Sequence, residues 1–281
     1  GNPGNQNFDA KLAGSIYKYV TNYANPFGMA AIVGTWGNNN LKWQKTQTHN
    51  VGLNAQFFKS RLNFTVDYQY RKNDPMLLRI DLPSSTGATS APMNIGATKN
   101  QSISGSLTAY IFKQRDLNWY ISANASHYTT EYYNIGDILQ KYNEEGRASQ
   151  TMLRYYDGAS TSALYVVRSA GIDPATGNEI FIKKDGTYTY EWNAEDEVLY
   201  GDSTPDVQGS INTSLTWKDF SFGASFSYRM GAETQLSTLL NKVENISTDQ
   251  LKYNQDVRAL TERWQKPGDI AKFKRIDDTM G

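Results

Sequence analysis

Hydrophobic and polar residues alternate with a period of two along six stretches of the chain, and this pattern predicts β-strands. From Val51 to Tyr70 the alternation is interrupted once, at Lys59-Ser60, which predicts a hairpin with a very short connection. Two further hairpins follow the same plan. The predicted strands are residues 51–58, 62–70, 101–112, 117–128, 209–217 and 220–228. The connections after the hairpins are long: residues 71–100, 129–208 and 229 onward.

Charged residues are nearly absent from these six stretches. Asp67 is the only Asp, Glu, Lys or Arg within them, although such residues make up 20% of the chain. The polar side of the alternation consists of Ser, Asn, Thr and Gln. The solvent face of a soluble sheet normally carries charges, whereas a lipid-facing strand avoids them, because Arg or Lys at the bilayer midplane costs about 2–4 kcal/mol. The pattern therefore favours an all-β, antiparallel transmembrane β-barrel with short periplasmic turns and long extracellular loops.

Aromatic residues beside the short turns fit the same prediction, because aromatic rings gather where a membrane protein crosses the bilayer interface. These residues are Phe57, Phe58, Phe112, Trp119, Trp217 and Phe220. An alternative interpretation remains open. A secreted β-sandwich that binds carbohydrate or mediates adhesion would also show alternating strands and aromatic loops.

Composition excludes several classes of function. The 28 Lys+Arg balance the 28 Asp+Glu, so no charge excess indicates nucleic acid. Cysteine is absent, and the two histidines, His49 and His127, have no partner ligands nearby in the sequence, so we expect neither a metal site nor a cofactor. No phosphate-binding loop, G-x-S-x-G or H-E-x-x-H motif occurs. We therefore predict that the chain is not an enzyme.

Acidic residues cluster in the predicted loops, where we interpret them as solvated charges. The clusters are Glu144-Glu145, Glu195-Asp196-Glu197 and Asp277-Asp278. A glycoside hydrolase would need two carboxylates at a fixed separation, and Glu195 with Asp196 would be the pair to test.

The long connection 129–208 contains the candidate ligand-binding residues. Two turns, at residues 173–177 and 184–187, flank a short predicted strand, Glu179 to Ile182, and together they predict a small meander. Aromatic side chains in loops above a rigid scaffold can stack on sugar rings or peptide side chains. The candidates are Tyr132, Tyr133, Tyr155, Tyr156, Tyr188, Tyr190 and Trp192.

The two ends of the chain carry no signal of a complete protein. The chain starts without Met or a signal peptide, and its longest apolar stretch, Phe27 to Gly34, is too short for a membrane helix. The last residues, from Arg275, are polar and form no terminating element. We expect a piece of a longer chain.

A series of short motifs resembles the barrel signature of SusC/RagA-type TonB-dependent transporters. The segments that carry the resemblance are 40–46, 50–53, 57–62, 74–78, 82–87, 94–96, 124–126, 170–177, 184–186 and 263–269. Among them are Ala-Gly-Ile-Asp-Pro-Ala-Thr-Gly at 170–177 and Arg-Trp-Gln-Lys-Pro-Gly-Asp at 263–269. Two positions depart from the family pattern: Gln44 stands where Glu is usual, and Pro75 interrupts the Asp-Leu-Leu motif.

The resemblance implies that residues 1–281 form part of the β-barrel domain, from its second half. They would supply about eight to ten of about 22 strands, without the plug domain and the closing C-terminal strands. It also implies a multi-pass outer-membrane protein that imports an oligosaccharide or peptide nutrient. The implied partners are a SusD-like surface lipoprotein, the TonB complex and outer-membrane lipid.

Overall fold

The computed structural model describes residues 16–20, 30–38, 40–82, 84–86, 90–246, 250 and 252–276. Parts of two predicted features, the apolar stretch from Phe27 and the motif at 82–87, lie outside these residues, as does the whole Asp277-Asp278 pair. The chain divides into two compact units. Unit 1 comprises residues 1–140, 155–161 and 206–230, and unit 2 comprises residues 141–154, 162–205 and 231–281.

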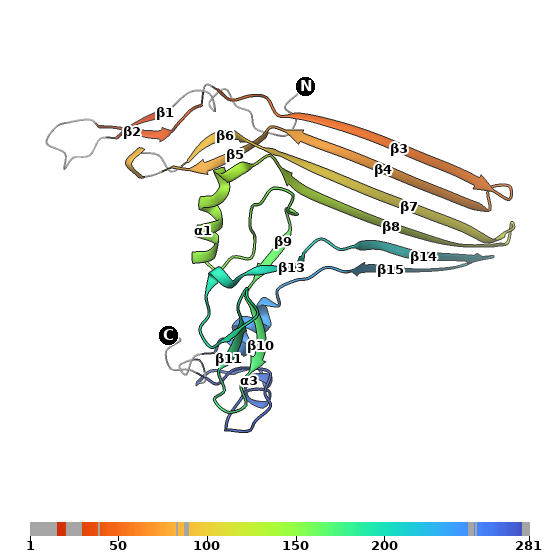
Figure 1. The fold of residues 1–281 in the computed structure, drawn as a ribbon. Coiled ribbons are helices and arrows are strands. Elements are labelled where there is room, and N and C mark those ends of the chain that lie inside the picture. Colours follow the sequence, from red (N-terminus) through yellow and green to blue (C-terminus); the bar gives the residue numbers. More distant parts are fainter. Residues whose placement is uncertain are drawn as a thin grey trace. The chain divides into compact units, whose positions relative to one another are not determined.

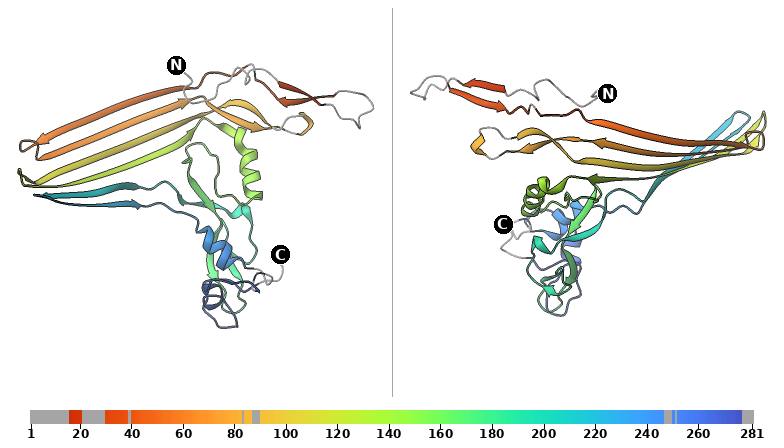
Figure 2. Two further views of the ribbon diagram at one scale, coloured as in Figure 1. Left: turned by 180° about the vertical axis from the view of Figure 1, so that it is seen from behind. Right: turned by 45° about the horizontal axis from the view of Figure 1, so that its top comes forward.

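Unit 1 contains a six-stranded antiparallel sheet with the strand order β15-β14-β8-β7-β4-β3. The strands lie side by side in every view (Figures 1 and 2). Their bounds are β3 (Lys45–Phe57), β4 (Leu62–Asp74), β7 (Ala97–Lys113), β8 (Leu117–Tyr133), β14 (Val207–Trp217) and β15 (Phe220–Met230). All six predicted strands and all three predicted hairpins are confirmed. The hairpins also pair with one another, β4 with β7 and β8 with β14.

The register places residues of the same kind in rows across the whole sheet. One row is entirely apolar: Ala55, Phe64, Leu107, Ala123, Ile211 and Phe226. The adjacent row is entirely polar: Asn54, Thr65, Ser106, Asn124, Ser210 and Ser227. Because neighbouring residues of a strand point to opposite faces, this register separates an apolar face from a polar face across six strands.

The apolar face is uncovered. Val51 and Phe226 on this face are 70% and 68% exposed, and Ala97 is the only buried residue in the six described strands. In a β-sandwich, the apolar face of one sheet packs on the apolar face of a second sheet. The described part of the chain provides no such second sheet, so the structure disfavours the sandwich alternative.

The polar face is connected by hydrogen bonds between side chains. Asn124 Nδ2 donates to Ser210 Oγ (2.7 Å), and Ser225 Oγ donates to Asn212 Oδ1 (2.6 Å). Asn73 accepts from Thr46 Oγ1 and donates to Thr98 Oγ1. These uncharged bonds link neighbouring strands, which explains how the strands can dispense with charges on this face.

Short turns close all three hairpins, and aromatic residues adjoin them as predicted. Phe58, Lys59 and Ser60 have positive φ angles of 53°, 56° and 62°. At the next turn the rings of Phe112 and Trp119 stack with centroids 6.1 Å apart.

Unit 1 also contains two shorter pairs of strands. They are β1 (Ile16–Val20) with β2 (Ala30–Thr35), and β5 (Met76–Asp81) with β6 (Ser90–Ile95); the 3-10 turns are η2 (Ser84–Thr86) and η3 (Gly136–Leu139). Gly96 follows β6 with a φ of +47°, and a Cβ there would lie 2.6 Å from Cγ2 of Ile135. The close approach of Gly96 and Ile135 therefore requires glycine.

Unit 2 is built from short elements. Its strands are β9 (Ala163–Val166), β10 (Arg168–Ile172), β11 (Glu179–Ile182), β12 (Tyr188–Thr189) and β13 (Val198–Asp202). Its helical segments are α1 (Gln140–Ala148, of which Gln140 belongs to unit 1), η4 (Ala194–Asp196), α2 (Ser237–Leu239), η5 (Leu240–Glu244) and α3 (Arg258–Thr261). The predicted meander is confirmed as the antiparallel sheet β10-β11-β12. Among the described residues, no helix is long and apolar enough to span a bilayer.

A small core holds the last part of unit 2 together. It consists of Val243, Ile246, Ala259 and Phe273. Arg263 crosses this core, and its guanidinium donates to the backbone oxygens of Val243, Glu244, Ala259 and Lys274. Burial lowers the pKa of Arg263. The Arg of the Arg-Trp motif thus ties the chain around residue 263 to the segments on either side.

Candidate ligand-binding site

The turn at residues 173–177 is built by the side chain of Asp173. Its Oδ1 accepts from the backbone N–H of Ala175 (2.9 Å), and its Oδ2 accepts from Thr176 Oγ1 (2.7 Å) and from the Tyr190 hydroxyl (3.0 Å). The hydrogen bonds from Ala175 and Thr176 lower the pKa of Asp173. The bond to Tyr190 fixes an aromatic ring that follows β12 against the turn that follows β10.

The second predicted turn has the same construction. Asp185 Oδ1 accepts from Thr187 Oγ1 (2.6 Å) and from the Thr187 backbone N–H (2.9 Å). These bonds, with the hydroxyl of Thr187 as the largest contribution, lower the pKa of Asp185. Gly186 completes the turn with a φ of +85°.

The 263–269 motif contacts the first turn, although the two lie about 90 residues apart in the sequence. Trp264 Nε1 donates to the Pro174 carbonyl (2.9 Å), and the Gly268 N–H donates to the same oxygen (2.8 Å). A Cβ on Gly177 would lie 2.5 Å from the ring of Trp264. Two motifs that the sequence presents as separate signatures are therefore two halves of one contact.

This contact borders a surface hollow of about 240 Å³ in unit 2. The residues that line it are Gly177, Asn178, Glu179, Phe181, Tyr190, Trp192, Lys274 and Arg275. Tyr190 and Trp192 are 56% and 44% exposed. The Arg275 N–H donates to the Gly177 carbonyl (2.9 Å), which holds the two basic residues beside the aromatic ones. Aromatic faces for stacking and cations for hydrogen bonding thus share one open surface.

The predicted ligand-binding aromatics separate into groups. Tyr190 and Trp192 line the hollow, and Tyr188 is exposed on β12. In unit 1, Tyr132 and Tyr155 have ring centroids 5.5 Å apart.

The two remaining candidates have different surroundings. Tyr133 lies on the opposite face of β8 from Tyr132, where Lys99 Nζ is 3.7 Å from its ring centroid. Tyr156 accepts a backbone bond from Ala159. Ligand contact stays a prediction for all seven residues.

Six of the eight lining residues were not among the predicted ligand-binding residues: Gly177, Asn178, Glu179, Phe181, Lys274 and Arg275. The sequence pattern predicted Phe181 only as part of the short strand from Glu179 to Ile182. Lys274 and Arg275 lie about 90 residues beyond the meander, and only the contact between the two motifs brings them to it. The only local signal in the sequence was that the motifs at 170–177 and 263–269 both contain turn-forming residues.

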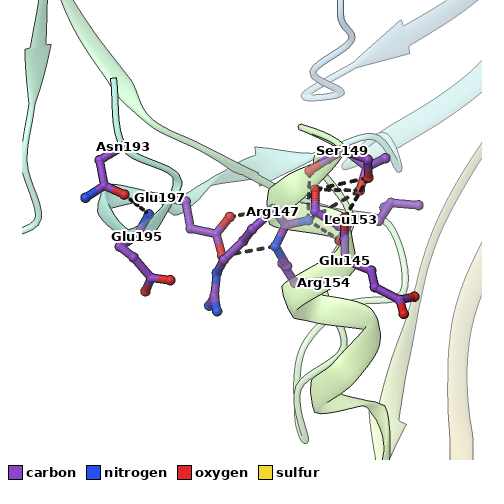
Figure 3. Close-up of polar contacts among 10 residues, drawn as sticks. Glu145, Arg147, Ser149, Leu153, Arg154, Asn193, Glu195 and Glu197 are labelled. Atoms are coloured by element: carbon purple, nitrogen blue, oxygen red, sulfur yellow. Dashed lines mark hydrogen bonds and ion pairs between the residues drawn. The ribbon is translucent and has the colours of Figure 1, made fainter. Parts of the chain in front are cut away.

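The interpretation of Glu197 as a solvated loop charge is wrong. Its side chain is 5% exposed and forms ion pairs with Arg154 Nη2 (2.6 Å) and Arg147 Nε (2.8 Å) (Figure 3). Arg154 is 2% exposed and also donates to the Thr151 carbonyl. Glu197 therefore joins α1 and the following loop to β13, which is a structural role.

The neighbouring residues Glu195 and Asp196 take part in local hydrogen bonds. Asp196 Oδ1 accepts from the Lys184 N–H (3.2 Å). The backbone N–H of Glu195 donates to Asn193 Oδ1 (3.0 Å) in a local turn (Figure 3). Within the described residues, no group of three or more His, Cys, Asp or Glu side chains could hold a metal ion. The two histidines lie in the large sheet: His49 contacts the ring of Tyr70, and His127 Nδ1 bonds the Asp206 carbonyl.

No protein-family model matches the chain. Curated proteins with similar sequences are TonB-dependent receptors. The chain is 27% identical over 229 residues to TonB-dependent receptor P3 of Formosa agariphila, covering 74% of this chain and 22% of the relative. It is 27% identical over 223 residues to TonB-dependent receptor SusC of Bacteroides thetaiotaomicron, covering 76% of this chain and 22% of the relative.

The fold is similar to that of the RagAB peptide transporter, with a TM-score of 0.74 and 24% identity over 94% of this chain and 29% of that chain. The resemblance to SusC/RagA-type receptors is confirmed along most of the chain. The chain spans about a fifth of the length of the curated relatives.

Proposed function

We propose that this chain is a section of the barrel wall of a SusC/RagA-type TonB-dependent transporter, with residues 1–281 lying entirely in the barrel domain. The observation that carries the proposal is the unbroken, uncovered apolar face of the six-stranded sheet. A lipid-facing wall needs such a face, and a closed barrel leaves no unpaired strand edge in the bilayer. The short turns then face the periplasm and the long connections face the cell exterior.

The height of the apolar face supports this placement. From Trp119 near the short turn to His127 is eight residues, or about 26 Å along the strand. At a tilt of about 40° this corresponds to about 20 Å across the membrane, close to the apolar band of about 25 Å in outer-membrane barrels. Beyond His127, charged residues return on the same face at Glu131, opposite Lys99.

The function that follows is import of a glycan or peptide nutrient across the outer membrane. The relatives named as TonB-dependent receptors support energy supply through the TonB complex. The RagAB structure is that of a peptide transporter, which supports a SusD-like lipoprotein as the partner and a peptide as one of the two substrate classes. The hollow at Tyr190 and Trp192 is the ligand contact that we assign to this chain.

The full-length protein in its native membrane tests the proposal. We expect it in the outer-membrane fraction, with faster gel mobility before boiling than after. A soluble protein without heat-modifiable mobility would refute the barrel assignment.

Uptake of labelled peptides and oligosaccharides by cells carrying Trp192→Ala then tests the ligand contact. We expect slower uptake with unchanged protein abundance. Leu199→Ala, which removes another exposed apolar side chain of unit 2, provides the control.

A further inference from the structure

The apolar face of the large sheet carries lysines at the ends of β3 and β4 that lie away from the short turns. Moving along β4, Tyr68 pairs with Val51 in the apolar band, and Tyr70 pairs with His49 at its edge. The next residue on this face is Lys72, which pairs in register with Lys99 of β7. Two adjacent lysines thus lie one step beyond the aromatic edge of the apolar band, in a row that continues to Gln47 on one side and to Glu131 on the other.

A concave surface accompanies these lysines. A hollow of about 700 Å³ in unit 1 is lined by Leu41, Lys42, Trp43, Lys45, Gln47, Lys72, Asp74 and Pro75. Three lysines face one carboxylate, so the hollow carries a net positive charge. Lys72 Nζ lies 2.7 Å from Asp74 Oδ2, which holds one ammonium group in place, and Trp43 adds a half-exposed ring.

The wall of this hollow is held by the β5–β6 hairpin. Asn94 of β6 accepts from the Lys42 N–H (2.6 Å) and donates to the Lys42 carbonyl (3.0 Å). Asn38 Nδ2 donates to the Pro92 carbonyl (3.1 Å), and Trp36 Nε1 donates to the Thr86 carbonyl (2.9 Å). The segment that contributes Lys42 and Trp43 is therefore positioned by specific hydrogen bonds.

We propose that this hollow binds the phosphorylated head group of a membrane lipid, whose acyl chains lie along the apolar rows of β3 and β4. The inference rests on the proposed membrane location and goes beyond transport. The matching feature is amphipathic: the lysines lie beyond the row of His49 and Tyr70, on the same face of the strands as the exposed Val51 and Leu53, as a phosphate stands at the end of its acyl chains. Because the short turns mark the periplasmic side, the lipid belongs to the outer leaflet, where phosphorylated glycolipid is the fitting occupant.

Native mass spectrometry of the full-length transporter in detergent tests the proposal, with diphosphoryl lipid A as the probe. Each lysine near a charged head group contributes about fivefold to affinity. We therefore expect the triple variant K42Q/K45Q/K72Q to bind lipid A about a hundredfold more weakly. The matched triple variant K59Q/K113Q/K218Q, with lysines at the short-turn end, should bind like the native protein.

Asp74→Asn should change the affinity for lipid A in the opposite direction, because it removes the one carboxylate that lines the hollow. We expect this variant to bind lipid A more tightly than the native protein. Dephosphorylated lipid A should bind weakly to every variant. Equal binding by the two triple variants, or displacement of lipid A by equimolar inorganic phosphate, would overturn the proposal, and the latter would indicate a site for soluble anions.

Heat-modifiable mobility of each variant reports on folding. It separates failure of this inference from failure of the barrel assignment, because a protein without the mobility shift would refute the barrel itself.

Discussion

Leu107 offers a direct test of which face of the sheet meets lipid. It lies in the apolar row of β7, and its neighbour Ser106 lies in the polar row. Both side chains are exposed in the sheet, so both have room for a larger residue. Leu107→Arg places a cation on the apolar face, and Ser106→Arg places the same cation on the polar face, one residue away.

The position of Leu107 sets the expected magnitude. The apolar part of β7 lies between Lys99 and Phe112, and Leu107 is between one and two residues from its midpoint. With a rise of about 3.3 Å per residue and a tilt of about 40°, Leu107 lies about 4 Å from the midplane. An arginine near the midplane costs about 2–4 kcal/mol, whereas a lumen-facing substitution leaves stability nearly unchanged. We expect Leu107→Arg to lower the ratio of folded to unfolded protein about a hundredfold.

Denaturant unfolding of the full-length barrel in lipid vesicles measures this difference. The free energy of unfolding should fall by about 3 kcal/mol for Leu107→Arg and by less than about 1 kcal/mol for Ser106→Arg. Equal losses, or a larger loss for Ser106→Arg, would refute the assignment of the faces.

Three further predictions concern unit 2 in the full-length protein. Glu197→Gln should destabilise this unit by about 3–5 kcal/mol, because it leaves two arginines without their carboxylate. Increased protease cleavage measures this loss, with Glu195→Gln as the exposed control. Equal cleavage of both variants would contradict the structural role of Glu197. Gly177 has a φ of +73°, and a Cβ there would press against the indole ring of Trp264, so Gly177→Ala should destabilise the loop. Gly186 has open space at a φ of +85°, so Gly186→Ala should lower the free energy of unfolding by only about 1–2 kcal/mol and less than Gly177→Ala does. Equal losses in thermal unfolding would argue against the contact between Gly177 and Trp264. Because hydrogen bonds lower the pKa of Asp173 below its ordinary 3.8, its contribution to stability is complete above that pH and is lost as the pH falls through the lowered value. The hydrogen-exchange protection factors of the meander, which are corrected for the intrinsic pH dependence of amide exchange, should therefore be constant from about pH 7 to pH 5 and should fall in acid. The fall should be smaller in Asp173→Asn, and an unchanged fall would show that Asp173 does not control the turn.

The large sheet could be predicted because its physical signals are local. Alternation from Val51 to Tyr70 specifies both strands and the turn between them, and the same holds for the other two hairpins. The strands continue beyond the predicted ends, to Lys45 and Tyr133, because charged and polar residues at these ends interrupt the alternation without interrupting the backbone pairing.

The candidate site could be predicted only in part, because contacts between distant segments leave little local trace. The aromatic content of the loop indicated Tyr190 and Trp192. The approach of Trp264 to Pro174 and the burial of Glu197 both depend on residues that are tens of positions away. The sequence alone predicts that a carboxylate in an acidic cluster is solvated, because it does not show which arginines lie beside it in the fold.

Lipid contact along β7 tests the central claim most directly. This chain contains no cysteine, so single cysteines at positions 102 to 109 can be labelled individually with a fluorophore, provided any cysteines elsewhere in the full-length protein are replaced. In vesicles of brominated lipid, the account predicts strong quenching at 103, 105, 107 and 109 and weak quenching at the positions between them. Quenching without this alternation, or quenching at the even positions, would contradict a lipid-facing wall.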